Sequence, residues 1–230
     1  MFFNSGYLIF MLPAFLLTML AQMYVSSSFK KWSRVPASSG LSGAEAAARL
    51  ARFAGVNISI EGVRGQLSDH YDPRTRTLRL SPAVFQGGSV ASLAVAAHEL
   101  GHALQHKEGY SPLRLRSMLV PVVNFGSYLG WILLMIGLLL RLTDLAWLGV
   151  AVFSGGVLFA LVTLPVELNA SKRARALLAQ TGLIRSEQEM RGVSTVLNAA
   201  ALTYVAALFT AVMQLLYWVS LVAGMGGRRR

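Results

Sequence analysis

Apolar and polar stretches alternate along the 230-residue chain and divide it into six segments. Four segments are apolar, and each is long enough to cross about 30 Å of hydrocarbon as a helix; they are residues 7–25, 119–140, 145–166 and 201–224. Neither Lys nor Arg precedes the first of them, and no small-x-small cleavage site follows it. We therefore expect residues 7–25 to remain as an anchor rather than to be cleaved as a signal peptide.

The polar segment 26–118 has the patterning of a small globular part. In chain order we expect a helix over 43–55, a strand over 56–63, two short strands within 66–81, a linker over 82–89 and a helix from there to about 107. Ser42 and Ser89 precede the two helices and are residues that cap helix N-termini. Asp72 and Pro73 favour a turn between the two short strands.

The second polar segment, 167–193, follows the third apolar run directly. Its pattern is that of two polar helices with a break near Gly182. Together the six segments predict a membrane α-helical bundle of four transmembrane helices with a small α+β part.

Composition and charge support a membrane protein. Hydrophobic residues make up 54% of the chain and charged residues 13%, about half the usual charged share, which is too little to cover a soluble surface. The net charge is +11, but the Lys and Arg residues lie between and beside the apolar runs with little aromatic interleaving, so nucleic acid is not expected as a partner. The chain has no Cys, so a metal site must use His and carboxylates.

The distribution of positive charge predicts the orientation in the membrane. Of the 21 Lys and Arg residues, 17 fall within the polar segments and 4 in the remaining loop and tail. Because positive residues near the ends of spans favour the cytoplasmic side, we expect the polar segments in the cytoplasm and both termini outside. The three tail arginines, 228–230, oppose this orientation.

A short motif within the helix that ends near residue 107 indicates metal chemistry. His98 and His102 are four residues apart, so a helix presents both imidazoles on one face, with Glu99 beside them. A hydrolytic zinc site uses three protein ligands and leaves a position for water, and a nearby glutamate serves as general base. The alternative is that the motif arises by chance and that the histidines are hydrogen-bonded groups in an ordinary helix.

The motif leaves the third ligand open. His106 shares the helix face, but the eight residues from His98 rise about 12 Å, too far for one ion, so we expect it near the site or on the surface. Glu167 is the best candidate, because it ends the third apolar run on the side of the motif and a carboxylate at that place needs a reason. The alternative is an interface charge paired with Lys172 or Arg173.

Three blocks in this order resemble those of the bacterial membrane neutral zinc metallopeptidases of the YugP type: His98 to His102, Asp69 to Pro73 with the following strand to Ser81, and Pro165 to Arg173. The resemblance covers nearly the whole chain. It implies a zincin-like, specifically gluzincin-like, catalytic part in a multi-pass protein of the bacterial plasma membrane. It also implies one zinc ion per chain on His98, His102 and Glu167, with Glu99 as general base.

The resemblance adds weaker candidates around the site. Related membrane zincins often carry an Asp at the position of Ser171 to orient a histidine, so Ser171 or Asn169 is expected to make that bond here, and Arg173 closes the same block. The strand 77–81 is expected at a sheet edge, where extended substrate pairs with the main chain. Residues that would hold substrate, polarise the oxyanion or simply build the turn are His70, Tyr71 and Asp72; Tyr110 and Tyr204 are weaker candidates.

The sequence therefore predicts an integral membrane zinc endopeptidase that cuts membrane or membrane-proximal proteins. Its expected partners are a protein or peptide substrate and the lipid bilayer, with a membrane protein regulator as a further possibility. The alternatives are a non-catalytic membrane scaffold or adaptor and a zinc hydrolase of non-peptide substrates. Two imidazoles and a carboxylate also suit Mn, Co or Fe.

Overall fold

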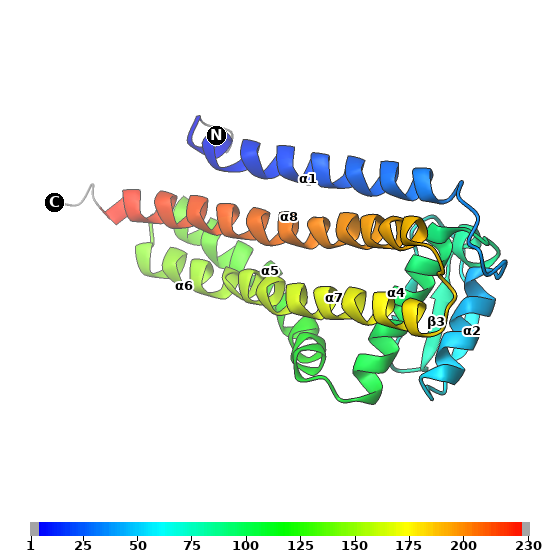
Figure 1. The fold of residues 1–230 in the computed structure, drawn as a ribbon. Helices are drawn as coiled ribbons and strands as arrows, with labels where there is room; N and C mark the ends of the chain where they lie inside the picture. Colours follow the sequence, from blue (N-terminus) through cyan, green and yellow to red (C-terminus); the bar gives the residue numbers. More distant parts are fainter. Residues whose placement is uncertain (1–4, 227–230) are drawn as a thin grey trace. The chain divides into compact units, whose positions relative to one another are not determined.

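The computed structural model describes residues 5–226 (Figure 1). These residues divide into two compact units. The apolar unit contains the described residues among 5–20, 114–165 and 203–226. The polar unit contains residues 21–113 and 166–202. The predictions made for the two chain ends and the tail arginines concern residues 1–4 and 227–230, which lie outside the described residues.

Among residues 5–226, four helical stretches are long and apolar enough to cross a membrane. They are α1 (Ser5–Trp32), α5 (Ser111–Leu139), α6 (Thr143–Phe153) together with α7 (Gly155–Gln180), and α8 (Glu187–Gly226). Three of the predicted apolar runs fall within these stretches, and the run 119–140 ends one residue beyond α5. The run 145–166, however, is not one helix. It is interrupted by a turn at Ser154, next to Gly155 and Gly156, since glycine is a poor helix former.

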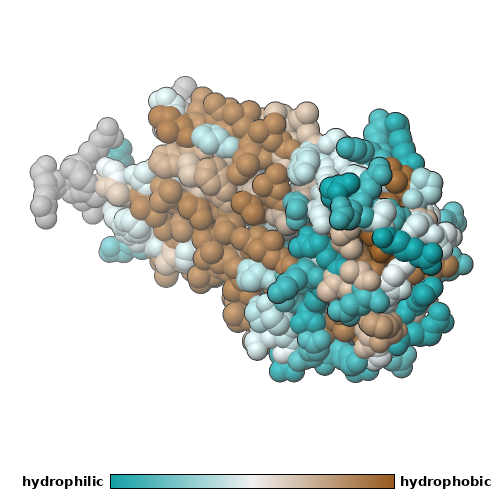
Figure 2. Space-filling view, in the orientation of Figure 1, coloured by the Kyte–Doolittle hydropathy of each residue, from teal (hydrophilic) through white to brown (hydrophobic). Residues whose placement is uncertain are grey.

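The apolar unit has its own core and an apolar exterior. Tyr217 contacts Tyr7 edge to face with ring centroids 5.1 Å apart, which joins α8 to α1. A Cβ on Gly137 would lie 2.5 Å from the backbone nitrogen of Ala146, so only glycine permits this approach of α5 to α6. Figure 2 shows apolar side chains gathered over the helices of this unit. Leu139, at 81% exposure, is typical of this exterior, which suits lipid as the surrounding solvent.

The polar unit contains the remaining elements. In chain order they are α2 (Gly43–Phe53), β1 (Ser59–Gly62), β2 (His70–Asp72), β3 (Thr77–Leu80), α3 (Pro82–Phe85) and α4 (Val90–Lys107). The predicted caps are confirmed, because the Ser42 hydroxyl accepts from the backbone of Glu45 and the Ser89 hydroxyl accepts from the backbone of Ser92. The linker expected over 82–89 contains the short helix α3, which starts at a proline as helices often do.

The three strands form one sheet in the order β1-β3-β2. β1 is parallel to β3, and β2 is antiparallel to it, as expected of two strands joined by a turn. The prediction that residues 77–81 form an edge strand is wrong, because β3 lies in the middle. The burial of Thr77, Leu78 and Leu80 fits a central strand, and β2 provides an edge instead.

Helix α4 lies in the core of the polar unit. Twelve of its residues are buried, and its apolar side chains share one core cluster with α2, β3, α7 and α8. The largest fully buried side chains of this cluster include Leu50, Leu78, Leu93, Leu100 and Leu178. The histidine motif is therefore carried by a helix that is held from several sides.

Glu189, near the start of α8, connects α8 to the loop that precedes α2. Its carboxylate accepts hydrogen bonds from the backbone N–H groups of Ser38 at 2.6 Å, Ser186 at 3.0 Å and Arg185 at 3.1 Å. Burial raises the pKa of Glu189, but these hydrogen bonds outweigh it and hold the pKa at about 2, against an ordinary value of 4.5. The residue precedes the apolar run 201–224, so solvent protons can titrate it.

We expect Glu189→Gln to destabilise the protein by about 2 kcal/mol, because bonds to a charged acceptor are replaced by weaker ones. The folded pKa lies below the unfolded one. The contribution of the Glu189 carboxylate to the free energy of unfolding is therefore complete above about pH 4.5 and is lost as the pH falls toward 2. Thermal unfolding of the detergent-solubilised protein across this range measures both effects. Glu187→Gln, at a 94% exposed position, is the control, and an equal loss in both variants would contradict the prediction.

Candidate metal centre

Helix α4 presents His98 and His102 side by side. Their ring centroids are 4.9 Å apart, their ring planes are nearly perpendicular, and each side chain is 12% exposed. This is the arrangement that the spacing of four residues predicts for a helix. Both imidazoles are thus mostly removed from water, and a buried polar group without a partner costs free energy.

Glu167 on α7 meets the two histidines. Its Oε2 lies 3.2 Å from Nε2 of His98 and 3.5 Å from Nε2 of His102, and its side chain is only 2% exposed. One ligand atom from each residue lies within 4.8 Å of the others. Two imidazole nitrogens and a carboxylate oxygen fit the donor set of a zinc site with three protein ligands.

The electrostatics of the group favour a cation. Burial opposes charge on His102, but hydrogen bonding with Glu167 and the charges of Glu99 and Glu167 outweigh it and raise its pKa. Negative charge thus dominates around this imidazole, and a proton or a metal ion is stabilised there. The partly buried Glu99 is close enough to contribute to this field.

Gly101 allows α4 to lie directly against α7. A Cβ on Gly101 would be 2.7 Å from the backbone oxygen of Ala170 and 3.1 Å from its Cα. Backbone atoms cannot move aside as the end of a flexible side chain can. The small residue between the two histidines therefore sets how closely they approach Glu167.

We expect Gly101→Ala to separate α4 from α7, destabilise the polar unit by about 1–3 kcal/mol and weaken zinc binding, because the added methyl group overpacks the contact. Zinc affinity by chelator competition and thermal unfolding measure the two effects. Gly156→Ala is the control on α7, since nothing lies within 4 Å of its added Cβ. Unchanged zinc affinity in Gly101→Ala would contradict the interpretation.

The second ring nitrogens of the histidines also have partners. Nδ1 of His98 lies 3.1 Å from the hydroxyl of Ser171, and Nδ1 of His102 lies 3.0 Å from Oε1 of Gln105. Ser171 was expected from the sequence to make such a bond. Gln105 was not, although its place three residues after His102, on the same face of a helix, is a signal that could have found it.

Asn169 and Arg173 extend the network of hydrogen bonds that includes Gln105. Asn169 Oδ1 accepts from Arg173 Nε at 2.6 Å, and Arg173 Nη2 pairs with Glu108 at 2.7 Å. The Arg173 guanidinium also lies 6.0 Å from the ring centroid of Tyr110. This connects the C-terminal end of α4 to α7. Tyr204, a weaker candidate, lies on α8 in the apolar unit.

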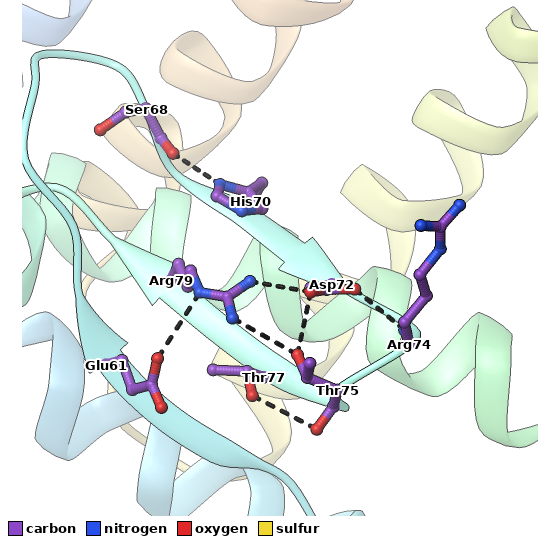
Figure 3. Close-up of polar contacts among 8 residues, drawn as sticks. All are labelled: Glu61, Ser68, His70, Asp72, Arg74, Thr75, Thr77 and Arg79. Atoms are coloured by element: carbon purple, nitrogen blue, oxygen red, sulfur yellow. Dashed lines mark hydrogen bonds and ion pairs between the residues drawn. The ribbon is translucent and has the colours of Figure 1, made fainter. Parts of the chain in front are cut away.

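The side chains of β2 have different surroundings (Figure 3). Asp72 accepts from the backbone of Arg74, the hydroxyl of Thr75 and the guanidinium of Arg79, each at 2.9 Å. The bond from Arg79 is the main reason that the pKa of Asp72 is far below its usual range. These contacts hold the turn together, so Asp72 fits the alternative that it builds the turn. His70 is exposed, with Nδ1 2.8 Å from the carbonyl of Ser68.

Tyr71 faces α4 rather than the turn. Its hydroxyl lies 2.9 Å from Nδ1 of His106, and their ring centroids are 5.9 Å apart. His106 is exposed, and the metal-compatible group found among the described residues is made of the other three side chains. Through His106, Tyr71 contacts the helix of the histidine motif.

Comparisons with known proteins agree with this chemistry. Residues 7–223 match a family described as "putative neutral zinc metallopeptidase". The chain is 48% identical over 204 residues to the "putative membrane protease YugP" of Bacillus subtilis (strain 168), covering 88% of this chain and 90% of that protein. No solved structure matches the chain.

Proposed function

Because the chain belongs to the neutral zinc metallopeptidase family, we propose that it is an integral membrane zinc-dependent endopeptidase. Its proposed zinc ligands are His98, His102 and Glu167, with one ion per chain. The observation that carries this proposal is the convergence of both Nε2 atoms on the buried Glu167 Oε2. A carboxylate that is 2% exposed and faces two imidazoles is well explained by a shared cation.

The proposed chemistry is hydrolysis of a peptide bond. A zinc ion held by these residues would act as a Lewis acid and would lower the pKa of a water molecule toward neutrality. Glu99 accepts the proton of the attacking water and returns a proton to the leaving amine. Its position next to His98 on α4, and its contribution to the field at His102, support this role.

The proposed substrates are membrane proteins or membrane-proximal segments. Glu167 directly follows the apolar run 145–166, so one zinc ligand is held next to the end of a span. β2 lies at an edge of the sheet, with which an extended segment can pair, and Tyr71 joins that strand to the histidine helix. On the charge distribution we propose that this chemistry takes place at the cytoplasmic face of the bacterial plasma membrane.

The substrate proposal is tested with one cleavable sequence in two formats, free in solution and tethered to a transmembrane helix in the same lipid nanodisc as the protein. We expect the tethered format to be cut faster, because tethering raises the local substrate concentration at the membrane. Rates are compared with those of Glu99→Gln under the same conditions. Free cleavage of the soluble peptide with sparing of the tethered one would refute the membrane-proximal proposal.

A further inference from the structure

Gln105 is a fully buried amide on α4 that bonds on both of its ends. Its Oε1 lies 3.0 Å from Nδ1 of His102. Its Nε2 lies 2.8 Å from the carbonyl oxygen of Val166 and 3.0 Å from Oδ1 of Asn169. The side chain thus joins a proposed zinc ligand on α4 to the backbone that immediately precedes Glu167 on α7.

The partners determine which way the amide of Gln105 points. A carbonyl oxygen only accepts, so the atom facing Val166 must be the amide nitrogen. Asn169 gives the same result independently, because its Oδ1 accepts from the guanidinium of Arg173, which only donates, and so presents an oxygen to Gln105. Oε1 of Gln105 therefore faces His102, and it can only accept.

An accepting Oε1 requires that Nδ1 of His102 carries the hydrogen. In the neutral ring, Nε2 is then the atom with the free lone pair, and Nε2 is the atom that faces Glu167. Ser171 is different, because its hydroxyl can donate to or accept from Nδ1 of His98. The two histidines are thus held in different ways, and the fixed tautomer belongs to His102.

We infer that Gln105 is a positioning residue of the metal centre, which holds His102 as the tautomer that offers Nε2 to the ion. This inference rests on the proposed function. It predicts that the accepting oxygen at position 105 matters more to zinc binding than the two hydrogen bonds donated by Nε2. Partners that orient ligating histidines typically contribute roughly 10–100-fold to metal affinity.

The test compares Gln105→Met, which keeps the volume but removes the acceptor, with Gln105→Glu, which keeps an acceptor but removes both donated bonds. We expect zinc affinity, measured by chelator competition on the full chain in detergent, to fall roughly 10–100-fold in Gln105→Met. In Gln105→Glu we expect an affinity above that of Gln105→Met, because the oxygen that accepts from His102 is kept even though the new carboxylate faces the oxygens of Val166 and Asn169. If Gln105 were merely structural, Gln105→Glu would bind zinc no better than Gln105→Met, and that order would overturn the inference.

A spectroscopic readout separates positioning from general destabilisation. With Co²⁺ in place of zinc, the wild type should show two exchangeable, paramagnetically shifted Nδ1–H proton signals, one from each ligating histidine. The His102 signal should persist in Gln105→Glu and exchange rapidly with water in Gln105→Met. Two slowly exchanging Nδ1–H signals in Gln105→Met would overturn the inference. If Gln105→Met does not fold, loss of the His102 signal in Gln105→Glu would overturn it instead.

Ser92→Ala is the matched control. Ser92 is also a buried polar residue of α4, and its hydroxyl donates to the carbonyl of Ala83, away from the metal centre. We expect Ser92→Ala to lose stability but not zinc affinity. An equal loss of zinc affinity in Ser92→Ala and Gln105→Met would count against a specific role of Gln105. Absence of zinc binding in the wild type would instead refute the proposed function, so the two failures are distinguishable.

Discussion

Glu99→Gln is expected to lower the rate of peptide hydrolysis by roughly 10²–10⁴-fold while zinc stays bound, because the amide cannot accept the proton of the attacking water. The substitution keeps the size of the side chain, and Glu99 is not among the three side chains that form the metal-compatible group. We therefore expect the folded protein to keep its zinc. Cleavage rate and zinc content of the same purified sample measure the two outcomes together.

Glu187→Gln is the matched control for this experiment, since it makes the same chemical change at a 94% exposed carboxylate. It should keep the full rate. A wild type that hydrolyses nothing, with full cellular function retained in Glu99→Gln, would indicate a scaffold rather than an enzyme. Hydrolysis of esters or non-peptide amides with no peptide cleavage would indicate a different substrate class for the same centre.

The second large effect concerns the metal itself. The wild-type protein should contain about one zinc ion per chain, and both His98→Ala and Glu167→Ala should lose most of it, because a hydrolytic site needs all three protein ligands. The loss should exceed the roughly 10–100-fold expected when only a partner of a ligand is removed. Elemental analysis of protein purified without chelators gives the stoichiometry, and chelator competition gives the affinity.

His106→Ala is the control for the ligand variants, because this exposed third histidine of the same helix should not affect zinc content. Zinc lost in His98→Ala but kept in Glu167→Ala would place the third ligand elsewhere. Treatment of the wild type with a chelator should abolish hydrolysis, and added zinc should restore it. Mn, Co or Fe in the native protein would change the identity of the ion but not the ligand set.

Local features of the chain could be predicted from the sequence because they depend on neighbouring residues. The four apolar runs follow from length and composition, and the caps at Ser42 and Ser89 follow from a hydroxyl that bonds to the backbone three residues later. The side-by-side placement of His98 and His102 follows from helix geometry. In each of these helices the interacting groups are a few residues apart, so the local sequence pattern is enough to predict the interaction.

Long-range features could be predicted from the sequence only in part, and in part through the resemblance. Glu167 was singled out as a carboxylate at the end of an apolar run, but its 3.2 Å approach to His98 depends on how α7 packs on α4. That approach in turn depends on Gly101 lying against Ala170, a contact between residues far apart in the chain. Sequence periodicity carries no information about which surfaces of two helices meet.

The sequence by itself determined the apolar runs, the helix of the motif and the choice of His and carboxylate as the proposed ligands, since these follow from local patterning and residue chemistry. Only the tertiary structure decided that β3 is the central strand, that Asp72 holds a turn, and that Gln105 accepts from His102. The physical reason is the same in each case. Strand order and buried hydrogen bonds are settled by side chains that meet across the fold, where each buried polar group must find a partner.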